Sequence, residues 1–373
     1  MAVSIETITQ ALATVIDPEL RAPITELDMV ESVDVTDTAV TVSVLLTIVG
    51  CPAAVAIERD VREALESVSE DLTVELSMGV MSLERREGLI TRLRSKTKTH
   101  RAFTPDSLTR VIAITSGKGG VGKSSVTVNL AAAVSKQGFR VGIIDADVFG
   151  FSIPGLLGLQ GTSPTRINDM ILPPIAFDMK VLSIGMFLES DQAVAWRGPL
   201  LHRTLEQFLT EAYFGDLDFL FLDLPPGTGD IAISVGQLLP HAEIVVVTTP
   251  QKSAADVAWR SADVARQTGQ KVLGVIENMS ASTLPDGSVL DVFGSGGGEE
   301  TARRLRVPLM GSVPLSPGLR EAGDAGVPLV LSDSDSPASR EILRVADAII
   351  RGGDSLAHMN LPLQVYRDKN GTE

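Results

Sequence analysis

The stretch that decides the fold of this chain is Gly117-Lys118-Gly119-Gly120-Val121-Gly122-Lys123-Ser124. It matches the phosphate-binding pattern G-x-x-x-x-G-K-[ST] and carries a further lysine in its second position. The apolar run 111–114 before it predicts a short buried strand, and the alanine-rich run 126–134 after it predicts a helix. A glycine-rich loop in that setting turns unpaired backbone N–H groups toward an anion. We therefore predict a nucleoside triphosphate site rather than a chance glycine-rich turn.

Short apolar runs recur after this loop, each flanked by helical or loop segments. They lie at 141–144, 219–222, 244–247 and 272–275. Continuous apolar strands that alternate with helices are typical of a parallel sheet buried on both faces. The sequence thus predicts an α/β fold, in which a mostly parallel sheet is covered by helices on both faces and is preceded by a small α/β domain.

The 373 residues divide into four regions by composition. We expect a small domain over 1–87, a basic linker over 88–108, the sheet domain over 109–350 and a polar tail over 351–373. Within the first region, the pattern predicts a helix over 5–16, a strand over 40–47, a helix over 53–68 and a strand over 72–76.

Aspartates close two of the predicted strands. Asp145 and Asp147 follow the run 141–144, and Asp223 follows the run 219–222. Ligands of a parallel sheet bind at the carboxyl ends of its strands, so we expect these carboxylates near the loop. Lys123 would then reach the β and γ phosphate oxygens, while Ser124 and Asp223 would hold Mg²⁺. The alternative is that such aspartates only cap helices or turns.

The net charge and the cysteine content of the chain bear on its partners and on its cellular compartment. The net charge of −15 argues against nucleic acid as the main partner, because phosphate backbones need a basic face. The basic stretch from Arg92 to Arg101 is interpreted as a solvated linker. The single cysteine, Cys51, permits no internal disulfide and fits a reducing compartment, so we expect a cytoplasmic protein.

One uncharged stretch, 39–57, is long enough to suggest a membrane span. Val40, Val42 and Val44 alternate with Thr41 and Ser43 there, which predicts a strand instead. The tail over 351–373 has no basic amphipathic stripe. We expect no membrane partner.

Several motifs resemble those of the deviant Walker A ATPases, a group that includes MinD, ParA, the nitrogenase iron protein and the Mrp/ApbC iron–sulfur carriers. They are Lys118 in the loop, Asp145-Ala146-Asp147, and the run from Asp223 to Asp230. The Mrp/ApbC branch in particular is resembled by Trp196-Arg197-Gly198-Pro199, Glu277-Asn278-Met279 and the run from Phe293 to Gly298. The resemblance covers about residues 108–331.

This resemblance implies an ATP-hydrolysing homodimer. Lys118 would reach across to the partner's nucleotide, and Asp147 would orient the attacking water. Asp145 would support the Mg²⁺ shell, and Asn278 would contact adenine. The remaining nucleotide contacts would come from Gly117, Gly119, Gly120, Val121, Gly122 and Ser125. The chain has no Asn-Lys-x-Asp motif for reading guanine, which also favours ATP.

The N-terminal region resembles the small metal–sulfur cluster assembly domain that often precedes such ATPases. The matching residues are Asp17-Pro18-Glu19 and the run from Leu46 to Pro52. Cys51 would lie at a helix N-terminus, where the dipole lowers the pKa of a thiol and favours the metal-binding thiolate. The alternative is that Cys51 is a small buried apolar residue.

The chain departs from the Mrp/ApbC pattern at the cluster ligands. Those carriers usually hold an iron–sulfur cluster through a C-x-x-C pair after Glu-Asn-Met, and residues 280–293 contain no cysteine. A [4Fe–4S] cluster takes about four thiolates, whereas a dimer of this chain offers one Cys51 from each subunit. Two hypotheses follow. One is a carrier or assembly ATPase with a transient cluster and with scaffold or client apoproteins as partners. The other is a partner-switching or positioning ATPase of the MinD/ParA kind.

Overall fold

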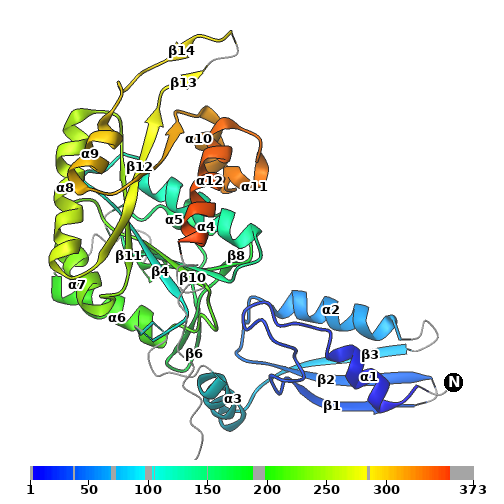
Figure 1. Ribbon diagram of the computed structural model, residues 1–373. Helices are drawn as coiled ribbons and strands as arrows, with labels where there is room; N and C mark the ends of the chain where they lie inside the picture. Colours follow the sequence, from blue (N-terminus) through cyan, green and yellow to red (C-terminus); the bar gives the residue numbers. More distant parts are fainter. Residues whose placement is uncertain are drawn as a thin grey trace, which may run out of the picture.

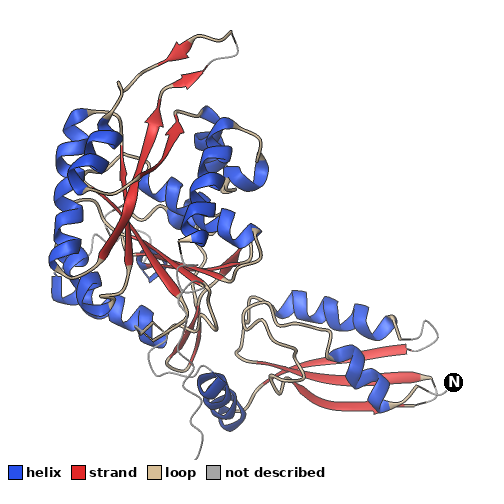
Figure 2. Cartoon of the chain, viewed as in Figure 1, coloured by secondary structure: helices blue, strands red, loops and turns tan. Residues whose placement is uncertain are grey.

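The computed structural model describes residues 3–352, except 37, 69–72, 97–102, 105, 149, 188–197 and 284–285. They form a small N-terminal domain and a larger domain built around an eight-stranded sheet (Figures 1 and 2). Among these residues, no helix combines the length and the apolarity that crossing a bilayer requires. The stretch 39–57 forms a strand and the start of a helix, as its alternation predicts.

The sheet of the large domain runs in the order β15-β12-β11-β4-β10-β5-β9-β8. Its strands are β4 (Arg110–Ser116), β5 (Val141–Asp145), β8 (Ile175–Ala176), β9 (Met179–Ser183), β10 (Phe219–Asp223), β11 (Glu243–Thr248), β12 (Lys271–Ser280) and β15 (Leu309–Pro314). All neighbours pair in parallel except β8, which is antiparallel to β9. The predicted parallel sheet is confirmed.

Helices cover both faces of this sheet, as β4 shows residue by residue. Val111 and Ala113 join the core beneath one group of helices, and Ile112 and Ile114 join the core beneath the other. The first group is α6 (Gly198–Glu211), α7 (Asp230–Leu238), α8 (Lys252–Gln267) and α9 (Gly297–Leu305). The second is α4 (Lys123–Lys136), α5 (Ile153–Leu156), α10 (Pro317–Asp324), α11 (Leu329–Ser332) and α12 (Pro337–Arg351). The two groups flank the sheet in Figure 1.

The N-terminal domain packs two helices on one face of a three-stranded sheet. Its elements are α1 (Ile5–Leu12), β1 (Val30–Val35), β2 (Ala39–Leu46), α2 (Ala54–Glu66), β3 (Thr73–Val80) and α3 (Leu83–Lys96). Strand β2 lies in the centre, antiparallel to β1 and parallel to β3. Its alternating Val40, Val42 and Val44 are fully buried against α1 and α2. Such alternation is typical of a sheet with one covered face.

The predicted linker over 88–108 differs from the structure in its first nine residues. These continue helix α3, whose Leu89, Ile90 and Leu93 are buried in the core of the N-terminal domain. Leu89 and Leu93 share a face because residues four apart are neighbours on a helix. Arg92 and Arg94, expected to be solvated, are about half exposed and pair with aspartates at the surface. Residues 97–102 and 105 of this stretch, and 353–373 of the predicted tail, lie outside the described part of the chain.

A hairpin that the sequence did not predict joins the two domains in space. Strands β6 (Thr165–Ile167) and β7 (Met170–Leu172) pair antiparallel near the N-terminal domain (Figure 1). Ile167, Met170 and Leu172 are buried in the core of the N-terminal domain, whereas Ile171 belongs to the core of the large domain. The hairpin is therefore shared by both cores. Two short strands outside the sheet, β13 (Ser282–Thr283) and β14 (Val289–Leu290), form a second hairpin after β12.

Candidate nucleotide-binding site

The glycine-rich loop joins the end of β4 to the start of α4. Gly120 and Gly122 both adopt φ near +79°, a conformation that L side chains rarely adopt. Gly117 is packed so tightly that an added Cβ would lie 2.2 Å from the backbone nitrogen of Ala258. Gly122 also serves as the N-cap of α4 and has no side chain to satisfy the first N–H groups of the helix. These donors are left for an anion.

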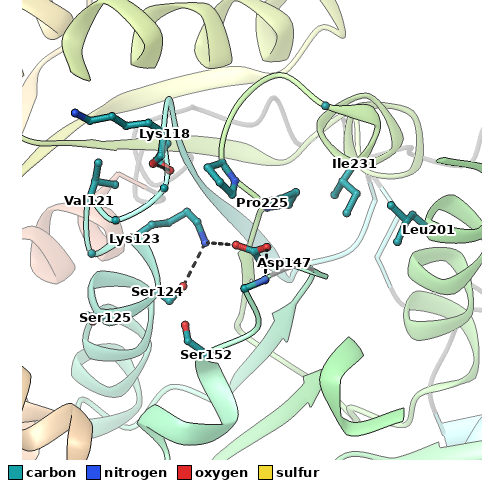
Figure 3. Close-up of a pocket in the computed structure, with 17 residues that line it drawn as sticks. Lys118, Val121, Lys123, Ser124, Ser125, Asp147, Ser152, Leu201, Pro225 and Ile231 are labelled. Carbon is teal, nitrogen blue, oxygen red and sulfur yellow. Dashed lines mark hydrogen bonds and ion pairs between the residues drawn. The ribbon is translucent and has the colours of Figure 1, made fainter. Parts of the chain in front are cut away.

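A pocket of about 680 Å³ opens over this loop (Figure 3). Its wall includes Lys118, Gly119, Gly120, Val121, Gly122, Lys123, Ser124, Ser125 and Asp147 from the predicted set. The other lining residues are Ser116, Gly150, Ser152, Leu201, Pro225, Pro226, Gly229 and Ile231. The volume lies in the range of small-molecule and cofactor sites.

Lys123 is bound to acidic and hydroxyl oxygens at the foot of the pocket. Its Nζ lies 2.7 Å from Asp223 Oδ2, 3.3 Å from Ser124 Oγ and 3.8 Å from Asp147 Oδ2. Ser124 Oγ donates to Asp223 Oδ2, and Thr127 Oγ1 donates to Asp223 Oδ1 at 2.9 Å. Lys123 is 6% exposed and Asp223 is fully buried. The pairing offsets part of the cost of burying both charges.

The residues at the foot of the pocket fit a magnesium ion by their chemistry. The Ser124 hydroxyl and the Asp223 carboxylate are hard oxygen ligands of the kind that Mg²⁺ prefers. The Lys123 ammonium lies against the same Asp223 oxygen that Ser124 contacts, so a positive charge is already stabilised at this point. Ser124 and Asp223 thus fit the ion by their chemistry, and their role as its ligands stays a prediction.

Asp145 and Asp147 order the segment that follows β5. Asp145 accepts hydrogen bonds from the backbone N–H of Asp147, the backbone N–H of Ile153 and the hydroxyl of Ser183. Burial, followed by the charge of nearby Asp223, raises the pKa of Asp145 to about 7. Asp147 accepts from the backbone N–H of Gly150 and faces Lys123 in Figure 3. The structure therefore directs Asp147 toward the pocket and uses Asp145 to shape the loop beneath it.

Asn278 lies behind the loop. Its Nδ2 donates to the backbone oxygen of Val121 at 2.9 Å, and the residue is 2% exposed. An added Cβ on Gly122 would approach this nitrogen to 2.2 Å. The described side chain thus supports the loop from the end of β12. Its predicted contact with adenine stays a prediction.

Lys118 points away from the other lysine of the loop. In Figure 3 its side chain extends to the side opposite Asp147. The ammonium donates to Gln251 Oε1 at 3.0 Å, at the residue just before α8. Lys118 therefore makes no contact with the Lys123–Asp223 pair in this single chain.

Sequence reasoning missed two kinds of site residue. Thr127 lies four residues after Lys123 on α4, so helical spacing alone could have placed it beneath the same aspartate. Leu201 comes from α6, far from the loop in the sequence, and no local pattern signals it. Pro225, Pro226 and Gly229 belong to a run that the sequence had already singled out.

The structure corrects the expectation for Cys51. The thiol does precede α2, and the Ala53 N–H lowers its pKa, as expected at a helix start. Burial has the larger effect, however, and with the charges of Glu19 and Asp17 it raises the pKa of Cys51 to about 11. The thiol donates to Glu19 Oε2 at 3.8 Å, and Glu19 Oε1 accepts from Thr165 of the large domain at 2.6 Å. Within the described residues, no group of three or more His, Cys, Asp or Glu is arranged to hold a metal.

Two family models match the chain. The model described as NUBPL iron-transfer P-loop NTPase covers residues 107–350, and the model described as iron-sulfur cluster assembly protein covers residues 5–76. A protein of Mycobacterium leprae called iron-sulfur cluster carrier protein is 51% identical, with 96% of each chain covered. A protein of the same name from Synechocystis is 38% identical and covers 91% of this chain and 96% of its own.

Two solved structures share the fold of the large domain. The nucleotide-binding protein from Archaeoglobus fulgidus in complex with ADP is 35% identical, with a TM-score of 0.53, and covers 63% of this chain and 90% of its own. The septum site-determining protein MinD from Pyrococcus horikoshii, complexed with Mg-ADP, is 24% identical, with a TM-score of 0.51. It covers 67% of this chain and 98% of its own, and at this identity it shows the fold alone.

Proposed function

Because the chain belongs to the family of NUBPL iron-transfer P-loop NTPases, we propose that it is an ATP-hydrolysing iron–sulfur cluster carrier that works as a homodimer. The observation that carries this proposal is the buried Lys123–Asp223 pair, with half-buried Ser124 bonded to it, beneath an open pocket. Relatives that match nearly the whole chain and are named iron-sulfur cluster carrier protein support the cargo.

The geometry supports phosphoryl transfer by positioning and charge. Backbone N–H groups of the loop and of the first turn of α4 would hold the phosphates, and Lys123 would exchange its contact with Asp223 for the β and γ oxygens. A magnesium ion held by Ser124 and Asp223 would neutralise charge on the leaving phosphate. Asp147 would orient the attacking water; this role is supported by one carboxylate oxygen that faces Lys123 in the pocket while the other accepts from Gly150 N–H. Lys118 of each subunit would serve the partner's nucleotide.

The cargo side of the proposal centres on Cys51. It is the single thiol of the chain, so a cluster bridging a dimer would have two cysteine ligands and would need others from a scaffold or a client apoprotein. That incomplete set favours transient holding over permanent residence. The cysteine count therefore supports a carrier that takes and releases a cluster with the help of partner proteins.

The test uses the full chain, purified without oxygen. Phosphate release from Mg-ATP is expected for the wild-type protein and is expected to be lost in Lys123→Ala. Iron and sulfide analysis after reconstitution is expected to give bound cluster that falls sharply in Cys51→Ser, a nearly isosteric change. Equal iron content in both proteins would remove Cys51 from the proposal. Absence of ATP hydrolysis in the wild type would reject the ATPase.

One observation favours a second candidate function. Residues 280–293 lack the cysteine pair, so the ATPase cycle has no cysteine ligand for a cluster in the large domain. A partner-switching ATPase, in which ATP drives dimerisation and no cluster is carried, would need only the pocket and Lys118. Its signature would be ATP-dependent dimerisation together with negligible iron in wild-type and Cys51→Ser protein alike.

A further inference from the structure

Lys118 is held by a neighbour that the nucleotide mechanism does not use. Its Nζ donates to Gln251 Oε1 at 3.0 Å, and the contact is partly buried. Gln251 occupies the N-cap position of α8, but its side chain makes no capping hydrogen bond. The amide of Gln251 is thus engaged with the lysine and not with the helix it precedes.

The position of Gln251 is well defined by its surroundings. The preceding Pro250 packs against Gly297, where an added Cβ would lie 2.5 Å from the Pro250 carbonyl oxygen. Helix α8 in turn contacts the loop, because the Ser261 hydroxyl lies 3.2 Å from the carbonyl oxygens of both Ser116 and Gly227. Packing on both sides therefore fixes the backbone of Gln251 next to the phosphate-binding loop.

A neutral amide is a partner of limited strength for an ammonium group. A hydrogen bond from the ammonium to an amide oxygen carries formal charge on one partner only, whereas pairing of the same ammonium with a phosphate is charge-assisted on both sides and is stronger. The contact with Gln251 is therefore stable while no phosphate is within reach and is displaced when a charged nucleotide is presented.

We propose that Gln251 is a positioning residue for Lys118, which holds the ammonium in the single chain and releases it when a second, nucleotide-loaded copy docks. This inference rests on the proposed homodimer and adds an energetic cost that the partner's nucleotide must offset before the dimer forms. Each subunit breaks one Lys118–Gln251 contact on dimerisation, so the contact opposes docking until the partner's phosphates replace it.

The test measures the dissociation constant of the dimer by sedimentation velocity with Mg²⁺ and a non-hydrolysable ATP analogue. Gln251→Ala removes the contact and is expected to tighten the dimer about tenfold, from about threefold for each of two contacts. Gln251→Glu supplies a carboxylate that holds the ammonium more firmly and is expected to weaken the dimer by a similar factor. A residue that only stabilised the fold would not shift the constant in opposite directions.

Two controls isolate the contact. Gln267→Ala, at the other end of α8, removes an exposed glutamine that bonds Asp263 and is expected to leave the constant unchanged. In a Lys118→Ala background, both Gln251 variants are expected to match Lys118→Ala alone. Identical constants for wild type, Gln251→Ala and Gln251→Glu would overturn the inference while leaving the homodimer intact. A wild-type chain that stays monomeric with nucleotide would overturn the homodimer and this inference together.

Discussion

The nucleotide pocket and the surroundings of Cys51 differ in the charge that faces the buried functional group. In the pocket, Lys123 and Asp223 face each other at 2.7 Å, and both come from motifs of one domain. Around Cys51, the thiol faces carboxylates, and its partner Glu19 is in turn bonded by Thr165 from the other domain. The first region is organised for a charged ligand before it arrives. The second keeps its thiol protonated, so a metal or cluster must displace a proton to bind there.

The largest expected effect separates these two regions directly. Lys123→Ala removes the ammonium that would contact the phosphates, and we expect ATP turnover to fall by about a thousandfold or more. The alkylation rate of Cys51, which reports on the other region, should stay within about twofold of wild type. Phosphate release and mass spectrometry of the alkylated chain measure the two quantities.

Lys252→Ala is the matched control for that experiment, since Lys252 is exposed at the start of α8. It should retain wild-type turnover. A large change in Cys51 labelling in Lys123→Ala alone would contradict the separation of the two regions.

Two glycine-to-alanine substitutions test how closely the backbone is packed in the phosphate-binding loop and in the N-terminal domain. Gly117→Ala places a Cβ 2.2 Å from the backbone of Ala258, and we expect the free energy of unfolding to fall by about 2–3 kcal/mol. Gly88→Ala lies within helix α3, where an added Cβ meets nothing within 4 Å. It should raise the free energy of unfolding by about 0.5–1 kcal/mol. Urea unfolding of both variants gives the comparison, and equal effects would contradict it.

The protonation of Cys51 offers a smaller and pH-dependent effect. Its pKa of about 11, raised mainly by burial, lies above the working range, so the alkylation rate should rise about tenfold per pH unit between about pH 7 and 10. Glu19→Gln removes a charge that raises this pKa and should speed labelling about three- to tenfold at about pH 8. Because the chain has one cysteine, intact-mass measurement reports on this thiol alone.

Glu66→Gln, at an exposed position of α2 in the same domain, should label at the wild-type rate. A labelling rate that is flat between about pH 7 and 10 would show instead that the thiol is already ionised, as helix position alone had suggested.

The smallest expected effect concerns the exposed contact between the domains. Arg94 and Asp169 form an ion pair across them at 3.1 Å, with both side chains about half exposed or more. Arg94→Ala should therefore lower the free energy of unfolding by only about 0.2–1 kcal/mol. Ile167→Ala, which truncates a fully buried side chain of the shared hairpin, should cost about 2–4 kcal/mol. If the two variants were equally destabilising, the ion pair rather than the hairpin would join the domains.

Local pattern predicted most of the framework. The alternation of Val40, Val42 and Val44 located β2, and the apolar runs located β4, β5, β10, β11 and β12. The linker prediction was wrong over α3 because most residues of this helix are polar or charged and only Leu89, Ile90 and Leu93 form its buried apolar face. The hairpin β6–β7 escaped prediction because its strands are short and draw their burial from two different cores.

The amino-acid sequence by itself located the phosphate-binding loop, the aspartates that close the strands and the absence of the cysteine pair. Those features depend on residue types at fixed short spacings, and the backbone of a strand, loop and helix follows from them. Packing alone decided that Lys118 rests on Gln251, that Asn278 supports the loop and that Cys51 faces Glu19 with a raised pKa. Each of these depends on distance and burial between residues more than thirty positions apart, which no local spacing encodes.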